Sequence, residues 1–214
     1  AAAAEAPQQQ LSYWREQLAD VATLDLPTDR TRPAVQTFVG DSYGLEIPPE
    51  LCRALKRLSR ENGLTLAMLL LAGWQILLSR YSGQDDIAVG SPIANRTQEA
   101  LEPLIGCFVN TLVLRTDLSG DPTIEEVLRR VRDVSLSAYE NQDLPFEQVV
   151  EVLNPRRDLS RHPLFQVIFA MQNVPREALR LGDLEIGQLR LPATTTGFDL
   201  ELHFVEYADR LVGG

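Results

Sequence analysis

The sequence contains very little histidine, cysteine or lysine. Its 214 residues include two histidines, His162 and His203, and two cysteines, Cys52 and Cys107. Because the cysteines lie far apart and form no C-x-x-C pair, the sequence carries neither a zinc signature nor a disulfide framework, and we expect a reduced, cytoplasmic compartment. Lys56 is the single lysine, so arginine supplies almost all of the positive charge.

The chain also lacks a surplus of basic residues and a long apolar run. It has 20 Lys and Arg against 30 Asp and Glu, a formal net charge of −10. Nucleic acid binding needs clustered positive charge that replaces phosphate counterions, so this balance argues against it. Residues 64–78 form the most apolar stretch, which is shorter than the roughly 18 residues that span a membrane. Residues 1–4 lack the basic start of a signal peptide, and we expect no nucleic acid and no membrane among the partners.

The composition that remains, 44% hydrophobic and 23% charged, is typical of one compact globular domain. Apolar runs at residues 87–93 and 108–115 predict two strands joined by a long polar loop, and loops of that length are often functional. Residues 164–171 are so continuously apolar that they predict a strand covered on both faces.

Three further segments have weaker strand character. Residues 36–47 predict a strand interrupted by glycines, and residues 198–205 alternate between apolar and polar side chains, as a half-exposed strand does. Residues 212–214 resemble the start of a hairpin whose second strand does not follow.

Helices are predicted between these strands. Residues 11–18 have helical spacing, and Pro48-Pro49 opens a helix whose inward face holds Leu51, Leu55 and Leu58. Thr65 caps the next helix, which is apolar on all sides and is therefore expected to be buried. One of its faces holds Leu66, Leu69, Leu70, Gly73, Trp74, Leu77 and Tyr81.

Two more helices complete the pattern. Thr123 and Glu126 form a capping-box pattern before a helix whose inward residues are Val127, Val131, Val134 and Ala138. Pro145 starts a shorter helix. Helices and strands mixed in this way predict a single α/β sandwich in which helices cover a sheet.

Four segments carry a resemblance to a known family. They are GSPIANR from Gly90, IGCFVNTLVLR from Ile105, NQDLPFEQVV from Asn141 and RDLSRHPLFQVIF from Arg157. Together, in this order and spacing, they resemble signatures of the condensation domains of nonribosomal peptide synthetases. The flanks, residues 13–33 and 197–211, are also similar to that family.

The resemblance implies a fold and a domain division. A complete condensation domain has two chloramphenicol-acetyltransferase-like lobes, and this chain resembles the second: an α/β two-layer sandwich with a mixed sheet covered by helices. Residues 1–34 would be a helix and linker that lead into the lobe, and residues 35–214 the C-terminal lobe, truncated at its end. The family's catalytic motif HHxxxDG belongs to the first lobe, and no such pair of histidines occurs here. We therefore expect no catalytic residue in this chain.

The resemblance also implies an activity and partners. The family joins an acyl or peptidyl thioester on an upstream carrier domain to the amine of an aminoacyl thioester on a downstream carrier. Both substrates are held on 4′-phosphopantetheine, and no metal or directly bound cofactor is expected. The implied partners are the first lobe, the two peptidyl carrier domains and an adjacent adenylation domain. Alternatives are a non-catalytic lobe that docks carrier domains, or part of a related cyclization or epimerization domain.

Arg96 is the leading functional residue by this resemblance. It would form a salt bridge across the lobe boundary to the Asp of HHxxxDG, a task suited to a planar, permanently charged guanidinium. Asn95, Asn110 and Thr111 offer amide and hydroxyl groups that could orient a thioester or a pantetheine amide. Asn and Thr also cap their own turns, so both interpretations stay open for these three residues.

The other candidates lie in two loops. Gln142 and Asp143 precede Pro145, an arrangement that favours capping of the following helix over substrate contact. Ser160 and Arg161 are expected to face the substrate tunnel.

Neither histidine is expected to be catalytic. His162 stands where the family often has Asn, and His203 lies on the polar face of its strand. An isolated lobe would also expose an apolar surface, which predicts self-association.

Overall fold

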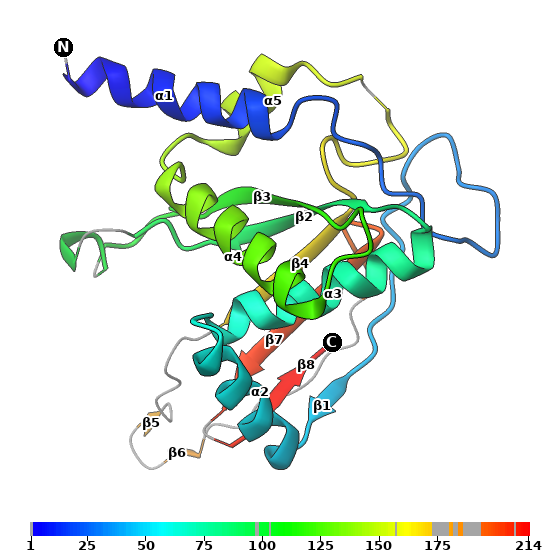
Figure 1. The fold of residues 1–214 in the computed structure, drawn as a ribbon, viewed down its shortest axis with the longest axis vertical. Coiled ribbons are helices and arrows are strands. Elements are labelled where there is room, and N and C mark those ends of the chain that lie inside the picture. Colours follow the sequence, from blue (N-terminus) through cyan, green and yellow to red (C-terminus); the bar gives the residue numbers. More distant parts are fainter. Residues whose placement is uncertain are drawn as a thin grey trace.

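The computed structural model describes residues 2–96, 99–102, 104–156, 158–172, 180–181, 184–185, 194–207 and 209–214. Thr97 and Gln98 of the expected polar loop, and Arg157 at the start of the fourth family-like segment, lie outside the described residues. Within them the chain forms one central sheet with helices packed against it (Figure 1).

The sheet has six strands in the order β1-β8-β7-β4-β2-β3. Their bounds are β1 (Leu45–Ile47), β2 (Asp86–Ile93), β3 (Asn110–Asp117), β4 (Val167–Gln172), β7 (Leu200–Glu206) and β8 (Leu211–Gly213). β4 runs parallel to β2 and to β7, and the remaining pairs are antiparallel. The sheet is therefore mixed, as expected. β5 (Arg180–Leu181) and β6 (Leu184–Glu185) pair with each other in a separate two-stranded sheet.

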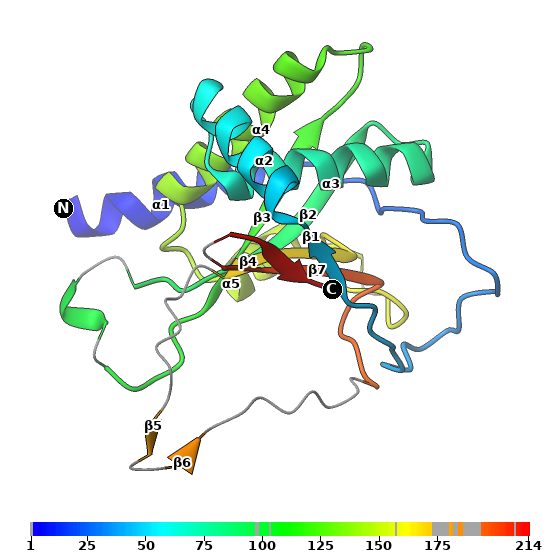
Figure 2. The same ribbon diagram turned by 90° about the horizontal axis from the view of Figure 1, so that it is seen from below.

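Five α-helices and a short 3-10 helix belong to the described residues. They are α1 (Ala2–Gln17), α2 (Pro49–Glu61), α3 (Leu66–Ser82), α4 (Ile124–Glu140), α5 (Phe146–Leu153) and η1 (Glu99–Leu101). α2, α3 and α4 lie on one face of the sheet, whereas the loop that carries η1 extends on the opposite side (Figure 2). α1 packs against α5. Helices on one side of a mixed sheet give the expected two layers.

The centre of the sheet is buried on both faces. Residues 167–170 of β4 are all buried, which confirms the prediction from their continuous apolar character. Gly90 of β2 allows this packing, because a Cβ atom there would lie 2.2 Å from the ring of Phe165. Only glycine lets the aromatic ring approach the strand this closely.

Both predicted threonine caps are confirmed. The Thr65 hydroxyl accepts a hydrogen bond from Met68 N at 3.2 Å, and the Thr123 hydroxyl accepts one from Glu126 N at 3.3 Å. Glu126 turns its carboxylate to Arg129 and Arg130.

The helix faces were predicted less well. In α2 the expected inward residues Leu51 and Leu58 are exposed, and Cys52 and Ser59 are buried instead. The row of Leu51 and Leu58 and the row of Cys52 and Ser59 are displaced by one residue along the helix. Helical spacing alone therefore could not show which row faces the core. In α3, Leu77 and Tyr81 are exposed, while Gln75 is buried. The prediction that α3 is buried on all sides is therefore wrong.

Two strand predictions also need correction. Of residues 36–47 only β1 joins the sheet, with one isolated bridge between Val39 and Thr195. Residues 212–214 do not begin an unpaired hairpin, because β8 is itself the returning strand: Leu211 pairs with Glu206 of β7 and Gly213 with Phe204. β8 also pairs with β1 on its other side.

Among the described residues no single helix has the length and apolar composition needed to cross a membrane. α2 and α3, which meet at an angle of 102°, satisfy that criterion of length and composition only when they are taken together.

Candidate functional site

Arg96 organises the loop between β2 and β3. Its guanidinium donates hydrogen bonds to the backbone carbonyls of Leu101, Glu102 (3.3 Å) and Gly106 (3.4 Å). It also lies over the ring of Phe108, 4.2 Å from the ring centre. One arginine therefore holds the loop between β2 and β3 together by a cation–π contact and several hydrogen bonds to backbone carbonyls.

The neighbouring candidates Asn95 and Thr111 are part of the same end of the sheet. Asn95 has a φ of 51°, a left-handed conformation that asparagine adopts more readily than most residues. Thr111 donates its backbone N–H to the Asn110 side chain at 2.9 Å. Both residues are half-buried.

Asn110 joins β3 to the start of α5. Its Nδ2 donates to the carbonyls of Gln142 and Leu144, both at 2.9 Å. Its Oδ1 accepts from Thr111 N at 2.9 Å and from Phe146 N at 3.0 Å. The carboxamide thus makes the four hydrogen bonds that it can make, and in this conformation it has no donor left for a thioester.

The capping expected of Gln142 and Asp143 is wrong, because Asn110 provides it. Pro145 is the N-cap residue of α5 and makes no capping bond through a side chain. Instead, Asn110, which lies in β3, accepts a hydrogen bond from the first N–H of the helix. Gln142 donates to the last turn of α4 at 2.7 Å, and Asp143 accepts from Gln10 of α1 at 3.1 Å. These two side chains therefore fasten the segment to the neighbouring helices.

Ser160 lies in a second group of polar residues, in contact with Asp158 and Arg32. Its backbone N–H and its hydroxyl both donate to Asp158 Oδ1, at 2.8 and 2.7 Å. These bonds hold the pKa of the Asp158 carboxyl below its ordinary value. The Ser160 carbonyl accepts a hydrogen bond from Arg32 at 3.1 Å.

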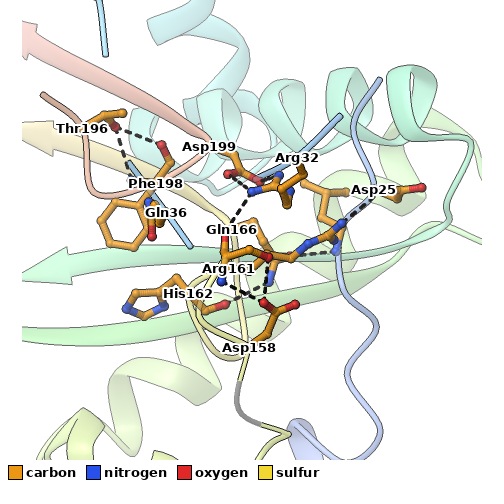
Figure 3. Close-up of polar contacts among 12 residues, drawn as sticks. Asp25, Arg32, Gln36, Asp158, Arg161, His162, Gln166, Thr196, Phe198 and Asp199 are labelled. Carbon is orange, nitrogen blue, oxygen red and sulfur yellow. Dashed lines mark hydrogen bonds and ion pairs between the residues drawn. The ribbon is translucent and has the colours of Figure 1, made fainter. Parts of the chain in front are cut away.

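Arg32 and Gln166 bind the N-terminal linker to the rest of the chain. Arg32 makes a two-armed ion pair with Asp199, in which Nη1 lies 2.9 Å from Oδ1 and Nη2 contacts Oδ2. The buried Gln166 accepts from Leu24 N at 2.7 Å and donates to the His162 carbonyl at 3.2 Å. Figure 3 shows how these bonds draw the linker, the loop before β4 and the turn before β7 together. We call this arrangement the linker junction.

Arg161 lines two cavities beside the linker junction. One has a volume of about 1060 Å³ and the other about 310 Å³, and both are lined by Thr23, Asp158 and Arg161. The Arg161 guanidinium lies 3.7 Å from the carboxylate of Asp25, which is largely exposed. This distance is too long for a strong hydrogen bond, so Arg161 is less firmly held than Arg32.

His162 belongs to a cluster of aromatic rings. Its imidazole lies 4.5 Å from the ring of Phe165, 4.9 Å from Phe198 and 5.8 Å from Phe146, centre to centre. Nδ1 lies 2.9 Å from the Pro163 carbonyl and must donate to it, since a carbonyl can only accept. Burial lowers the pKa of His162, although these backbone contacts oppose it. The ring is therefore a neutral packing residue.

The sequence missed Arg32, Gln166 and Asp199. A signal for Gln166 was present, because it is the single polar residue within an otherwise apolar strand-like run, and a buried polar side chain needs partners. For Arg32 and Asp199, which are 167 positions apart, no local pattern marked the pair.

The arrangement of the described candidate residues is suited to holding loops and bound groups in position. Arg96 and Asn110 stabilise loops, Arg161 lines both cavities beside the linker junction, and Ser160 lines the smaller one. The described residues contain no group of three or more His, Cys, Asp and Glu side chains placed to hold a metal ion.

Comparison with known proteins decides the family. The model of the condensation domain family matches residues 1–212. This chain belongs to the condensation domain family. Its mixed sheet with helices is the chloramphenicol-acetyltransferase-like α/β fold that the family's solved structures share.

Curated relatives are parts of nonribosomal peptide synthetases. Malpibaldin synthetase of Mortierella alpina is 49% identical over 205 residues, and the match covers 95% of this chain and 4% of that protein. A linear gramicidin synthase polypeptide of Brevibacillus parabrevis is 48% identical over 207 residues (95% and 4%). The dimodular nonribosomal peptide synthase of Bacillus subtilis strain 168 is 49% identical over 207 residues (96% and 9%). This chain thus spans a small share of the relatives it matches.

Solved structures of the family superpose closely. The X-domain from teicoplanin biosynthesis has a TM-score of 0.88 at 29% identity, covering 97% of this chain and 48% of that one. The same domain in complex with OxyB gives 0.86 at 29% identity, with 97% and 47% covered. The four-domain nonribosomal peptide synthetase AB3403, bound to AMP and glycine, gives 0.82 at 26% identity, with 96% and 17% covered.

Proposed function

We propose that this chain is the C-terminal lobe of a condensation domain that forms an amide bond between two carrier-bound substrates. An acyl or peptidyl thioester on an upstream carrier would react with the amine of an aminoacyl thioester on a downstream carrier. The match of the condensation family over residues 1–212 carries the proposal. The chain covers 48% of the X-domain chain, which supports its being one of two lobes. Residues 1–34 would then be the helix and linker that lead into the lobe formed by residues 35–214.

The contribution of this lobe would be orientation. Holding two tethered reactants in line for attack can lower a barrier by roughly 7 to 11 kcal/mol. The histidine of the HHxxxDG motif would come from the first lobe, so no catalytic histidine is assigned to the family-like segments of this chain. The cavities beside Ser160 and Arg161 are the described spaces that could admit part of a tethered substrate.

Arg96 would link the two lobes. Its contacts to Leu101, Glu102 and Gly106 use three of the five N–H donors of a guanidinium. The side chain can therefore stabilise its own loop and still offer N–H groups to the Asp of HHxxxDG. Asn95, beside it in the turn, would present the loop to the other lobe.

The partners follow from this role. The first lobe, an upstream and a downstream carrier domain, and an adjacent adenylation domain would surround the chain, with substrates held on 4′-phosphopantetheine. The many-domain relatives and the four-domain AB3403 support this context.

A second candidate is a lobe that docks proteins without chemistry. The similarity to the X-domain, which has been solved in complex with OxyB, supports this second candidate. Part of a cyclization or epimerization domain is a further alternative within the same fold.

The test uses the complete two-lobed domain of the parent protein with two loaded carriers. If the domain forms an amide, the acyl group moves to the downstream carrier. This transfer should disappear when the histidine pair of the other lobe is replaced by alanine. Carrier binding without transfer would reject condensation and favour the docking lobe.

A further inference from the structure

The end of α2 carries an asparagine that is followed directly by glycine. Asn62 is the C-cap residue of the helix, and Gly63 begins the turn that leads to α3. The side-chain carbonyl carbon of asparagine can be attacked by the backbone nitrogen of the next residue, and glycine, which has no side chain, hinders this attack least. Asparagine is accordingly among the thermally labile residues of proteins. The other asparagines, Asn95, Asn110, Asn141, Asn154 and Asn173, are followed by larger residues.

Hydrogen bonds to the last turn of α2 hold the two reacting groups apart. Asn62 Nδ2 donates to the Leu58 carbonyl at 2.9 Å, and the backbone N–H of Asn62 donates to the same carbonyl at 3.2 Å. The backbone N–H of Gly63 donates to the Arg60 carbonyl at 3.2 Å. The side chain of Asn62 and the amide of Gly63 are therefore each bound to a carbonyl of the helix and not to each other.

The backbone of Asn62 is also in a conformation that prevents ring closure. Its φ is −101° and its ψ is 7°. To form a ring through Cβ and Cγ, the nitrogen of Gly63 must lie on the same side of the Cα–C bond as Cβ. A ψ near zero turns that nitrogen toward the backbone nitrogen of Asn62 instead. The reaction therefore requires rotation about the Cα–C bond, one of the two soft backbone torsions, and this rotation breaks the hydrogen bond to Arg60.

The end of α2 can open without disturbing the core. Gly63 and Glu61 are exposed, Asn62 is half-buried, and the bond from its side chain to Leu58 is open to solvent. Terminal turns of helices open at a small cost in free energy compared with core elements. Leu64, the next residue, is buried and donates its backbone N–H to a helix carbonyl at 2.8 Å. It anchors the far side of the turn.

We propose that Asn62 is a site of spontaneous deamidation that the intact last turn of α2 holds back. When the turn opens, the Gly63 nitrogen loses its proton and attacks Asn62 Cγ. The N–Cγ bond forms, the Cγ–Nδ2 bond breaks, and the amide nitrogen leaves as ammonia with that proton. Water, the one co-reactant, then opens the five-membered ring at either of its two carbonyls and leaves aspartate or isoaspartate in place of asparagine. This proposal goes beyond the proposed function and does not depend on amide formation.

Deamidation removes the contact that restrained the side chain. A carboxylate has no N–H to donate to the Leu58 carbonyl, and its negative charge lies at the C-terminal end of a helix, where the helix dipole disfavours it. Isoaspartate also lengthens the main chain by one carbon just before Leu64, whose N–H bonds to Ser59. The modified chain should therefore unfold at a lower temperature, beginning at the corner where α2 and α3 meet at 102° (Figure 1).

The experiment incubates the complete two-lobed domain at pH 8, once folded and once unfolded in guanidinium chloride, and measures deamidation of each asparagine by peptide mapping with mass spectrometry. In the unfolded chain Asn62 should react faster than Asn95 and Asn141. In the folded chain it should react at least about tenfold more slowly than in the unfolded one, because two hydrogen bonds must break first. Equal rates in the two states would overturn the protection by α2. An unfolded-state rate at Asn62 no higher than at Asn95 and Asn141 would overturn the site.

Arg60→Gly tests whether the helix end controls the rate. Glycine weakens the last turn, so the folded variant should deamidate at Asn62 about fivefold faster than the wild type, whereas the rate in the unfolded chain should stay the same. Arg129→Gly is the matched control, because it also replaces an exposed arginine of a helix, α4, and it should leave the rate at Asn62 unchanged. Equal folded-state rates for Arg60→Gly and Arg129→Gly would reject control by the end of α2. Circular dichroism shows that each variant is folded.

Discussion

Asn110 Oδ1 accepts a hydrogen bond from Phe146 N at 3.0 Å, so a side chain at the start of β3 caps a helix that begins 36 positions later. The same carboxamide also binds the carbonyls of Gln142 and Leu144. One buried asparagine thereby fixes the junction of the sheet, the end of α4 and the start of α5.

Asn110→Ala should therefore destabilise the fold strongly. It removes four hydrogen bonds and leaves buried backbone groups unpaired, which costs about 2 to 4 kcal/mol in free energy of unfolding. Urea denaturation measures it. Asn62→Ala is the control, because it removes one exposed bond to Leu58 and should cost less than about 1 kcal/mol. Equal losses for the two variants would contradict the role given to Asn110.

The Arg32–Asp199 pair should show a measurable coupling energy. Both side chains are mostly buried, with exposed fractions of 24% and 19%, and their contact is two-armed. A double-mutant cycle with alanine at both positions should give a coupling of about 1 to 3 kcal/mol. For Arg57 and Glu61, exposed by 71% and 61% and 3.8 Å apart, the coupling should be below about 0.5 kcal/mol. If the two cycles agree, the linker junction is not what holds residues 20–36 in place.

Stability should fall as the pH drops below about 6.5, the ordinary value for histidine. Burial among aromatic rings lowers the pKa of His162 in the folded chain, so below that pH the unfolded chain takes up a proton that the folded chain resists. His162→Phe, which keeps the stacking, should flatten the dependence of the unfolding free energy on pH between 7 and 5. Losses from Asp158 and Glu201, whose pKa values are also lowered, appear only at more acidic pH. An unchanged slope in His162→Phe would show that another group titrates in this range.

Gly90→Ala should destabilise the central sheet. The new Cβ would lie 2.2 Å from the ring of Phe165, and such overpacking costs about 1 to 3 kcal/mol. Phe165→Leu in the same chain should recover part of this loss by making room, while Phe165→Leu alone destabilises. No recovery in the double variant would mean that the strand needs glycine for a reason other than the ring.

The isolated chain should self-associate through exposed apolar side chains. Ile105 and Val109 in the β2–β3 loop are exposed large apolar side chains. Sedimentation velocity at rising concentration measures association, and Ile105→Asp with Val109→Asp should reduce it. Leu136→Asp on α4, also an exposed apolar residue, is the control. A chain that stays monomeric at high concentration contradicts this expectation.

Local patterns were enough to predict much of the fold. The strands at residues 87–93 and 164–171, and the caps at Thr65 and Thr123, were recognisable because period, composition and capping chemistry all act within a few residues. The family-like segments pointed to the right fold, and they include parts of β2, β3, α5 and β4 together with the loops before or after them.

What the sequence could not predict depends on contacts distant along the chain. The inward face of α2 was displaced by one position, because Cys52 and Ser59 pack inward while Leu51 and Leu58 remain exposed. Capping of α5 by Asn110, and the pairing of Arg32 with Asp199, join residues that only the folded sheet brings together. The Glu201–His203 contact is local, but an alternating strand alone does not show that the two side chains meet.

The most direct test of the account is the mass of the downstream carrier after a single turnover with the complete two-lobed domain and a donor-loaded upstream carrier. If condensation occurs, the downstream carrier gains the mass of the donor acyl group and the upstream carrier returns to its free thiol. Mild aminolysis, which cleaves thioesters, should leave the new amide bond of the product intact. A downstream carrier of unchanged mass, although both carriers bind and are fully loaded, would contradict the proposal that this lobe belongs to an amide-forming enzyme.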